Sequence, residues 1–162
     1  MENKKELILL GKLERGYEGN IGIRKKDGWV NELAEEIGDF IENISNKLSH
    51  VYDEEVEENG LGYRICTSED NIQLRYYISD NEINSKEEIE EKYLEKILGS
   101  IDIALENIGY SEYTITGYDL VNFKLGGHDL EKIFSNYLGK YACIIVNKED
   151  IKEWVIHIKD TN

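Results

Sequence analysis

The sequence predicts a single α+β domain over residues 1–162, with a mainly antiparallel sheet and about three amphipathic helices packed on it. Several short segments alternate apolar and polar residues, as half-buried strands do. Other segments repeat apolar residues at three- and four-residue spacing, as amphipathic helices do. No linker-like segment or internal repeat divides the chain, and apolar residues make up 40% of it, which is enough for one core.

Two strands and a long helix are expected in the first third of the chain. Residues 6–16 (ELILLGKLERG) and 17–26 (YEGNIGIRKK) have strand character and are joined by a glycine-containing turn. After an Asp-Gly pair, the spacing predicts a helix over 29–48. Its apolar residues recur at helical spacing: Val30, Leu33, Ala34, Ile37, Phe40, Ile41, Ile44 and Leu48.

The middle of the chain predicts further strands and a second helix. Residues 61–68 (LGYRICTS) and 71–79 (NIQLRYYIS) alternate as strands do. A Ser-Lys-Glu-Glu capping box predicts a helix over 85–98. Residues 99–108 fit either continued helix or strand, and the Gly99-Ser100 pair at the start of the segment favours a strand.

The last third predicts a helix between strands. Residues 111–117 (SEYTITG) and 120–126 (LVNFKLG) are expected as two short strands. A helix should follow GGHDL and end at Gly139, a favourable C-terminal stop. Residues 140–147 (KYACIIVN) and 153–159 (EWVIHIK) then predict a terminal hairpin.

The composition predicts a cytoplasmic protein of a bacterial cell or a phage-infected host. No stretch approaches the roughly 18 apolar residues that span a bilayer, so no membrane partner is expected. The N-terminal apolar run is only LILL, too short for a signal peptide. Cys66 and Cys143 lie in apolar, strand-like surroundings and are expected to be small core residues, not a disulfide.

GGHDL, residues 126–130, is the one stretch that resembles a catalytic or metal-binding turn. His128 could act as a base or ligand that Asp129 orients, but adjacent residues entering a helix diverge by about 100°. The favoured interpretation is a helix start, in which the glycines free the backbone and Asp129 complements the helix dipole. His128 and Asp129 therefore remain weak catalytic candidates.

No cofactor or metal is expected. The chain has three histidines and two cysteines, none at a spacing typical of zinc sites. It has neither a GxGxxG nor a GxxxxGK[ST] phosphate loop, and no DxDxDG calcium loop. Any catalytic site would have to be assembled from residues distant in sequence.

Eleven tyrosines make the chain rich in aromatic residues. Tyr110, Tyr113 and Tyr118 lie close together and are a candidate contact patch, since tyrosine is enriched at interfaces. The alternative is that these rings fill a half-buried sheet face. Base stacking is disfavoured, because a protein of net charge −15 repels phosphate; direct nucleic-acid binding is not expected.

The acidic charge is concentrated in one part of the chain. Residues 27–58 hold eleven acids and one base, so they account for −10 of the net −15. Acids recur at three- and four-residue steps opposite the apolar side of the expected first helix: Glu32, Glu35, Glu36, Asp39 and Glu42. Like charges at this spacing cost an isolated helix a few tenths of a kcal/mol per pair, which favours a role in association.

A second acidic cluster follows, and a basic turn precedes the helix. The cluster comprises Asp53, Glu54, Glu55, Glu57 and Glu58. With the acidic helix it is the predicted binding surface for a protein with a basic surface. The basic turn, Arg24 to Lys26, could contact the acidic loop of a second copy, which leaves a homodimer as an alternative.

These features favour a non-enzymatic acidic protein that docks on and inhibits a basic, nucleic-acid-handling protein, as a phage-type anti-defence protein or nucleic-acid mimic would. A bacterial immunity protein that neutralises a toxin is the first alternative. A small enzyme with a site around His128, using Tyr118 and Asp119, is the second and is less favoured. A self-associating structural protein is the third.

Overall fold

A computed structural model describes residues 6–16, 19–45, 49–51, 63–68, 71–111 and 114–149. These residues form two sheets in which every strand pairing is antiparallel. The first sheet has the order β3-β2-β1-β11-β6-β7 and comprises β1 (Glu6–Arg15), β2 (Ile21–Arg24), β3 (Val30–Glu32), β6 (Ile72–Ser79), β7 (Glu95–Gly99) and β11 (Tyr141–Lys148). The second has the order β10-β9-β8-β5-β4 and comprises β4 (Ser49–Val51), β5 (Tyr63–Thr67), β8 (Ile101–Ser111), β9 (Thr114–Leu125) and β10 (His128–Asp129).

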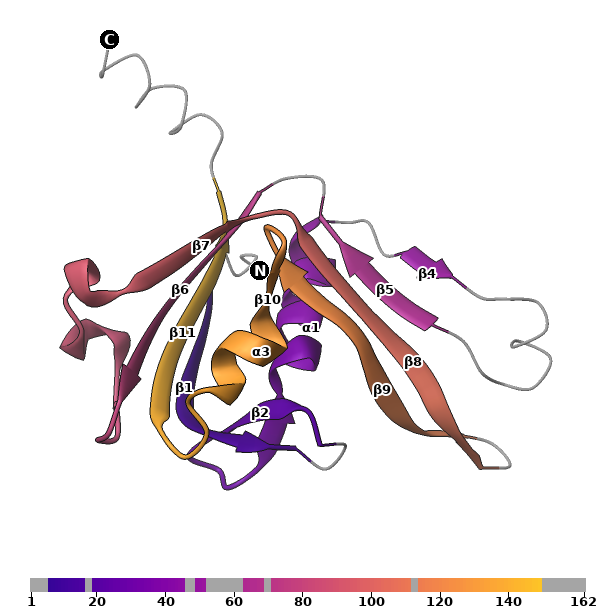
Figure 1. Ribbon diagram of the computed structural model, residues 1–162, viewed down its shortest axis with the longest axis horizontal. Coiled ribbons are helices and arrows are strands. Elements are labelled where there is room, and N and C mark those ends of the chain that lie inside the picture. Colours follow the sequence, from indigo (N-terminus) through magenta and orange to yellow (C-terminus); the bar gives the residue numbers. More distant parts are fainter. Residues whose placement is uncertain are drawn as a thin grey trace, which may run out of the picture.

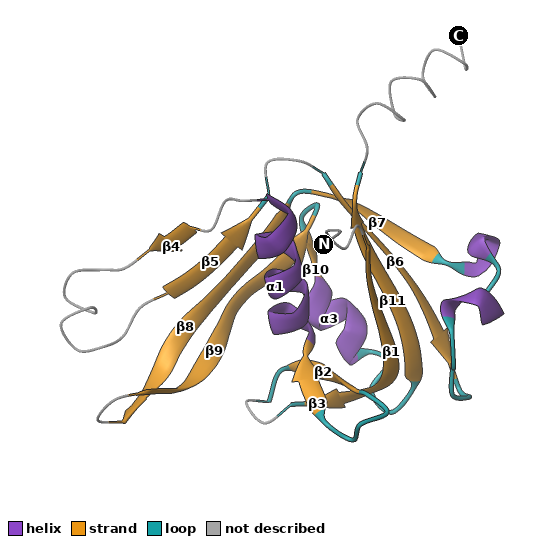
Figure 2. Cartoon of the chain, turned by 180° about the vertical axis from the view of Figure 1, so that it is seen from behind, coloured by secondary structure: helices purple, strands orange, loops and turns teal. Residues whose placement is uncertain are grey.

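The two sheets form a wedge. They meet where β7 continues into β8, and they splay apart from there (Figure 1). The helices α1 (Leu33–Ser45) and α3 (Leu130–Ser135) lie between them, as the reverse view also shows (Figure 2). Both sheets therefore direct one face toward the same pair of helices.

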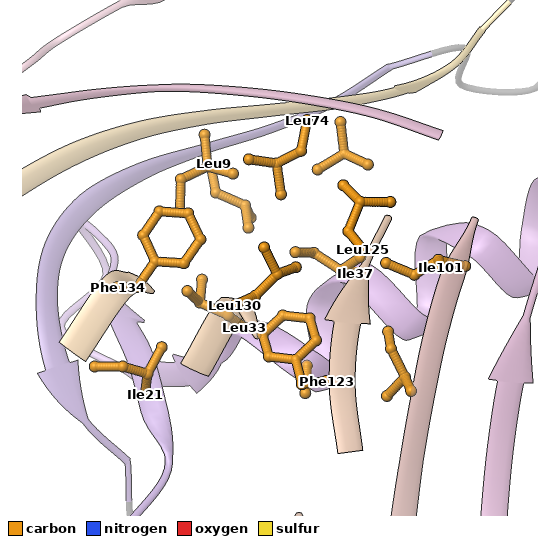
Figure 3. Close-up of a cluster of buried hydrophobic side chains, with 14 of the residues drawn as sticks. Leu9, Ile21, Leu33, Ile37, Leu74, Ile101, Phe123, Leu125, Leu130 and Phe134 are labelled. Carbon is orange, nitrogen blue, oxygen red and sulfur yellow. The ribbon is translucent and has the colours of Figure 1, made fainter. Parts of the chain in front are cut away.

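One apolar core fills the wedge, and both sheets and both helices contribute to it. Figure 3 shows its centre, where side chains from all four parts point toward one another. The labelled residues are Leu9, Ile21, Leu33, Ile37, Leu74, Ile101, Phe123, Leu125, Leu130 and Phe134. Each is at most 2% exposed, so the loss of any of these side chains would leave a cavity.

Strand β11 is apolar on both faces. Ala142, Ile144 and Val146 belong to the central core. Cys143 and Ile145 point to the opposite face of the sheet, where they form a second cluster with Ile83. A strand covered on both faces has a continuous apolar run, which is the pattern of residues 142–146.

The expectation of about three amphipathic helices packed on one sheet is wrong. Strands account for most of the described residues, and of the two α-helices there only α1 has more than six residues. The α+β assignment holds in its broad sense. The helices lie between two sheets instead of covering one face of a single sheet.

The helix expected over 85–98 is absent. The segment contains two 3-10 turns, η1 (Lys86–Glu88) and η2 (Glu91–Tyr93), followed by strand β7. Ser85 makes no side-chain cap, and the Glu88 carboxylate accepts from the backbone N–H of Asn84. Residues 95–99 instead pair with β6, whose edge would otherwise be open, so tertiary pairing overrides the local helical pattern.

The first helix begins later than the spacing predicts. Residues 30–32 pair with β2 as strand β3, and α1 starts at Leu33. The turn before β3 is closed by a bond from the Lys25 N–H to the Trp29 carbonyl, and the Asp27 carboxylate accepts from the Trp29 N–H. Val30 fits the helical spacing equally well, so the pattern could not show this boundary.

Most of the expected strands are confirmed. The ambiguous residues 101–108 belong to β8. Two short strands were expected over 111–117 and 120–126, but residues 114–125 form one long strand, β9, and Ser111 ends β8. β9 has a bulge at Val121, between its pairings to Leu105 and Ala104. The second half of the expected terminal hairpin lies outside the described residues.

The contact of Phe134 with Tyr76 ties α3 to the six-stranded sheet. The rings meet edge to face, with centroids 5.2 Å apart, and Phe134 is fully buried. We expect Phe134→Ala to lower the free energy of unfolding by about 3–5 kcal/mol, because it leaves a large cavity. Urea denaturation would measure the loss, and a loss below about 1 kcal/mol would show that α3 is not part of the cooperative core.

Candidate functional site

Helix α1 presents a partly acidic face away from the core. Its apolar residues Leu33, Ile37 and Ile41 are fully buried, which fixes the rotation of the helix. On the other side Asp39 is exposed, and Glu35 and Glu42 are partly exposed. Residues 35, 39 and 42 are spaced so that they follow one line along the helix, and no basic residue lies in its last turn.

Two of the five predicted acidic residues are placed differently. Glu32 ends β3 and is 7% exposed, and its carboxylate accepts from the Asn20 amide at 3.3 Å. Glu36 is in α1, and its Oε1 lies 2.5 Å from the Lys25 ammonium. Glu35, Asp39 and Glu42, which follow one line on the solvent side of α1, are hereafter called the α1 acidic row.

Other predicted contact residues cannot be placed. The acidic cluster over 53–58 and Tyr113 lie outside the described residues. Tyr110 lies in β8 and Tyr118 in β9, but their side chains are also outside the described part of the chain. The tyrosine patch remains a prediction.

GGHDL forms a hairpin turn followed by a helix start. Gly126 and Gly127 both have positive φ, +58° and +82°, between the paired residues Leu125 and His128. A two-residue loop with two positive φ values matches the twist of antiparallel strands. Asp129 is the N-cap of α3, and its side chain accepts from the Lys132 N–H at 3.2 Å. The motif thus begins a helix, after a turn that the sequence interpretation missed.

The residues proposed for an enzymatic site are not brought together. His128 is exposed beside Leu125, at the end of β9. Tyr118 and Asp119 pair with Asn107 and Glu106 farther along the same strand, roughly 20 Å away at the rise of a β-strand. Asp129 is engaged as a helix cap, and the strand register keeps its neighbour His128 apart from Tyr118 and Asp119.

Glu131 is half-buried, and its carboxylate makes a structural contact. Its Oε1 accepts from the backbone N–H of Ile21 at 2.7 Å, which joins α3 to the start of β2. Its Oε2 is buried without a hydrogen-bond partner in the described structure. Burial raises the pKa of Glu131, and the hydrogen bond from Ile21 opposes that shift only in part.

The cysteines are core residues, as expected. Both are free and buried, and burial raises the pKa of Cys143 to about 11. Cys143 is therefore a thiol near neutral pH and a poor nucleophile. Within the described ranges, no group of three or more His, Cys, Asp and Glu residues is placed to hold a metal ion. No helix in those ranges is long and apolar enough to cross a bilayer.

The basic turn makes contacts within the protein. Arg24 bonds the Glu14 carboxylate, Lys25 pairs with Glu36, and the Lys26 ammonium lies 3.2 Å from the Asn84 amide oxygen. The Arg24 hydrogen bond lowers the pKa of Glu14. These residues border a pocket of about 190 Å³ that sequence reasoning did not find. Its other members, such as Lys12, Ile83 and Tyr141, meet only through the sheet pairing.

Comparisons with known proteins assign no family: no family model, no curated protein and no solved structure matches this chain. Function must therefore be inferred from the residues themselves.

The two glycines of GGHDL should differ in tolerance to substitution. A Cβ on Gly126 would lie 2.5 Å from the Leu98 carbonyl oxygen, whereas a Cβ on Gly127 would meet nothing within 4 Å. We expect Gly127→Ala to cost about 1–2 kcal/mol from its backbone conformation, and Gly126→Ala to cost clearly more. Thermal and urea unfolding would measure both, and equal losses would contradict the close approach of the hairpin to β7.

The charge of Glu131 should make the stability depend on pH. The pKa of Glu131 is raised in the folded state. Its contribution to the free energy of unfolding is therefore fully present below the pKa that it has in the unfolded chain, and it is lost as the pH rises through the pKa of the folded state. Glu131→Gln keeps an oxygen acceptor for Ile21. We expect its stability relative to wild type to be higher at pH 7 than near pH 4, where wild-type Glu131 is protonated. Urea unfolding across this range would test it, and a difference independent of pH would contradict the role of burial.

Proposed function

We propose that this protein is a non-enzymatic, acidic binding protein that docks on and inhibits a basic, nucleic-acid-handling protein. The α1 acidic row supports this proposal most directly: it is a line of carboxylates on the solvent side of a helix, in a chain of net charge −15. A nucleic-acid duplex presents about one negative charge per 1.7 Å of axis, so a basic groove that binds it would also attract this surface.

The structure supports a rigid placement of these charges. The opposite side of α1 is buried between the sheets, and the buried thiol of Cys66 lies 3.6 Å from the Gly38 carbonyl oxygen in the middle of the helix. A helix held on its apolar side keeps its solvent side in one position, which lowers the entropic cost of association. Opposite charge would make that association fast and sensitive to salt.

The proposed location is the cytoplasm of a bacterial cell or a phage-infected host, where such a partner acts. A bacterial toxin with a basic surface would suit the same row, which would make the protein an immunity protein. The identity of the captured partner distinguishes the two.

The test is capture of the partner, followed by matched charge reversals. The tagged protein would be incubated with bacterial lysate at low and high salt, and the affinity of the retained protein would be measured with purified variants. We expect Glu35→Lys, Asp39→Lys and Glu42→Lys together to weaken binding by about tenfold or more, since three attractive charges become repulsive.

The control reverses three exposed glutamates of the segment over 87–95: Glu87, Glu90 and Glu95. Each reversal adds two charges, so both triple variants change the net charge from −15 to −9. Weakening in the α1 variant alone would support the docking surface. Equal weakening in both would show that binding depends on the net charge of the protein and not on the α1 acidic row. Unchanged affinity in both would refute the proposal.

A further inference from the structure

We propose that the pocket beside the basic turn binds a small organic monoanion, namely a carboxylate on an apolar ring or branched chain. This site is separate from the α1 acidic row, and its test does not depend on the proposed function. The pocket has a volume of about 190 Å³. It is lined by Leu10, Gly11, Lys12, Arg24, Lys25, Lys26, Glu82, Ile83 and Tyr141.

The apolar side of the pocket belongs to the outer face of the six-stranded sheet. Leu10 pairs with Cys143 across β1 and β11, and both contribute to the second apolar cluster. Ile83, which is 6% exposed, covers this face from the segment that follows β6. Tyr141 packs against the same cluster. A ligand in this pocket would therefore rest partly on apolar surface.

The charged side of the pocket is basic. Four of the lining residues carry a positive charge and only Glu82 carries a negative one, in a protein of net charge −15. Arg24 is compensated by Glu14, and Lys25 by Glu36. The Lys26 ammonium bonds the neutral amide of Asn84, and among the described residues neither Lys12 nor Lys26 forms an ion pair with a carboxylate.

This charge balance favours a monoanion. The four cations are balanced by Glu14, Glu36 and Glu82, so about one positive charge remains for a ligand. A polyanion such as nucleic acid needs many phosphate contacts, and the overall charge of the protein would repel it. A single carboxylate between two ammonium groups would gain charge-assisted hydrogen bonds without carrying excess charge.

The size favours a ligand with an apolar body. An apolar cavity of the order of 150 Å³ holds one benzene molecule, so this pocket has room for a ring with a carboxylate. Acetate would leave the apolar side unused, and an uncharged ring would leave the lysines unpaired. Both should bind more weakly than a ligand that combines the two groups.

The test is calorimetric titration of the full chain with benzoate, benzyl alcohol and acetate at low salt. We expect benzoate to saturate one site and the other two compounds to bind about tenfold more weakly or worse. In Lys12→Gln with Lys26→Gln, benzoate affinity should fall by about tenfold or more, because the charge is lost while most of the apolar stem is kept. The matched control is Lys96→Gln with Lys124→Gln, two exposed lysines outside the pocket, which should leave the affinity within about twofold.

Benzoate-dependent amide shifts of the wild-type protein provide a readout that needs no variant. We expect them to concentrate at residues 10–12, 24–26, 82–83 and 141. No saturable binding of benzoate, equal binding of acetate, equal loss in both double variants, or shifts elsewhere would each overturn the proposal. None of these results bears on the α1 acidic row, so the two proposals can fail separately.

Discussion

The structure depends on one apolar interior that two sheets share. In the described part of the chain, the inner faces of both sheets pack on the two helices and on each other, so each of the four parts contributes buried apolar surface to the others. α1 and α3 fill the space where the sheets splay apart, and the buried Phe134 and Ile37 remove that space from water.

Polar contacts at the margins fix the shape of the wedge. Where the sheets meet, Gly99 of β7 lies so close to Gly126 that a side chain on either would clash with the backbone of the other segment. The Gly126 N–H also donates to the Ser100 carbonyl at 2.9 Å. At the open side, the Glu131 carboxylate accepts a hydrogen bond from the N–H of Ile21, the first residue of β2. Ile21 is buried, so its N–H needs a partner within the protein.

The charges divide into two groups with different consequences. On the outer face of the six-stranded sheet, Glu6 accepts from both Arg75 and Lys86, and Arg75 also bonds Glu91. These ion pairs join the segment over 80–94 to β1 and β6, next to the apolar contact of Ile83. Exposed ion pairs add little stability one by one, so the apolar contact is the stronger anchor and the pairs set the position of the segment. The α1 acidic row lies on the side of the helix opposite the buried Leu33, Ile37 and Ile41.

The helices and strands whose pattern depends only on near neighbours in the chain were predicted well. The helical spacing over 33–45 identified α1, and alternation or continuous apolar runs identified β1, β6, β8 and β11, because burial of one face or both leaves a period in the sequence. The charge concentration and the capping role near Asp129 were likewise visible. The same patterns could not reveal that Glu32 is a strand residue in the interior.

The tertiary structure decided everything that depends on partners distant in sequence. Residues 95–99 became a strand because β6 offered an edge, although the capping box before them favours a helix. The pocket beside the basic turn required Ile83 and Tyr141 to meet Lys12, which only the sheet order brings about. The sequence by itself determined which segments are apolar on one face and where the charge lies. Which faces meet, and therefore which charges remain exposed, depended on packing between segments that are distant in the chain. Such contacts leave no pattern in the local sequence of either segment.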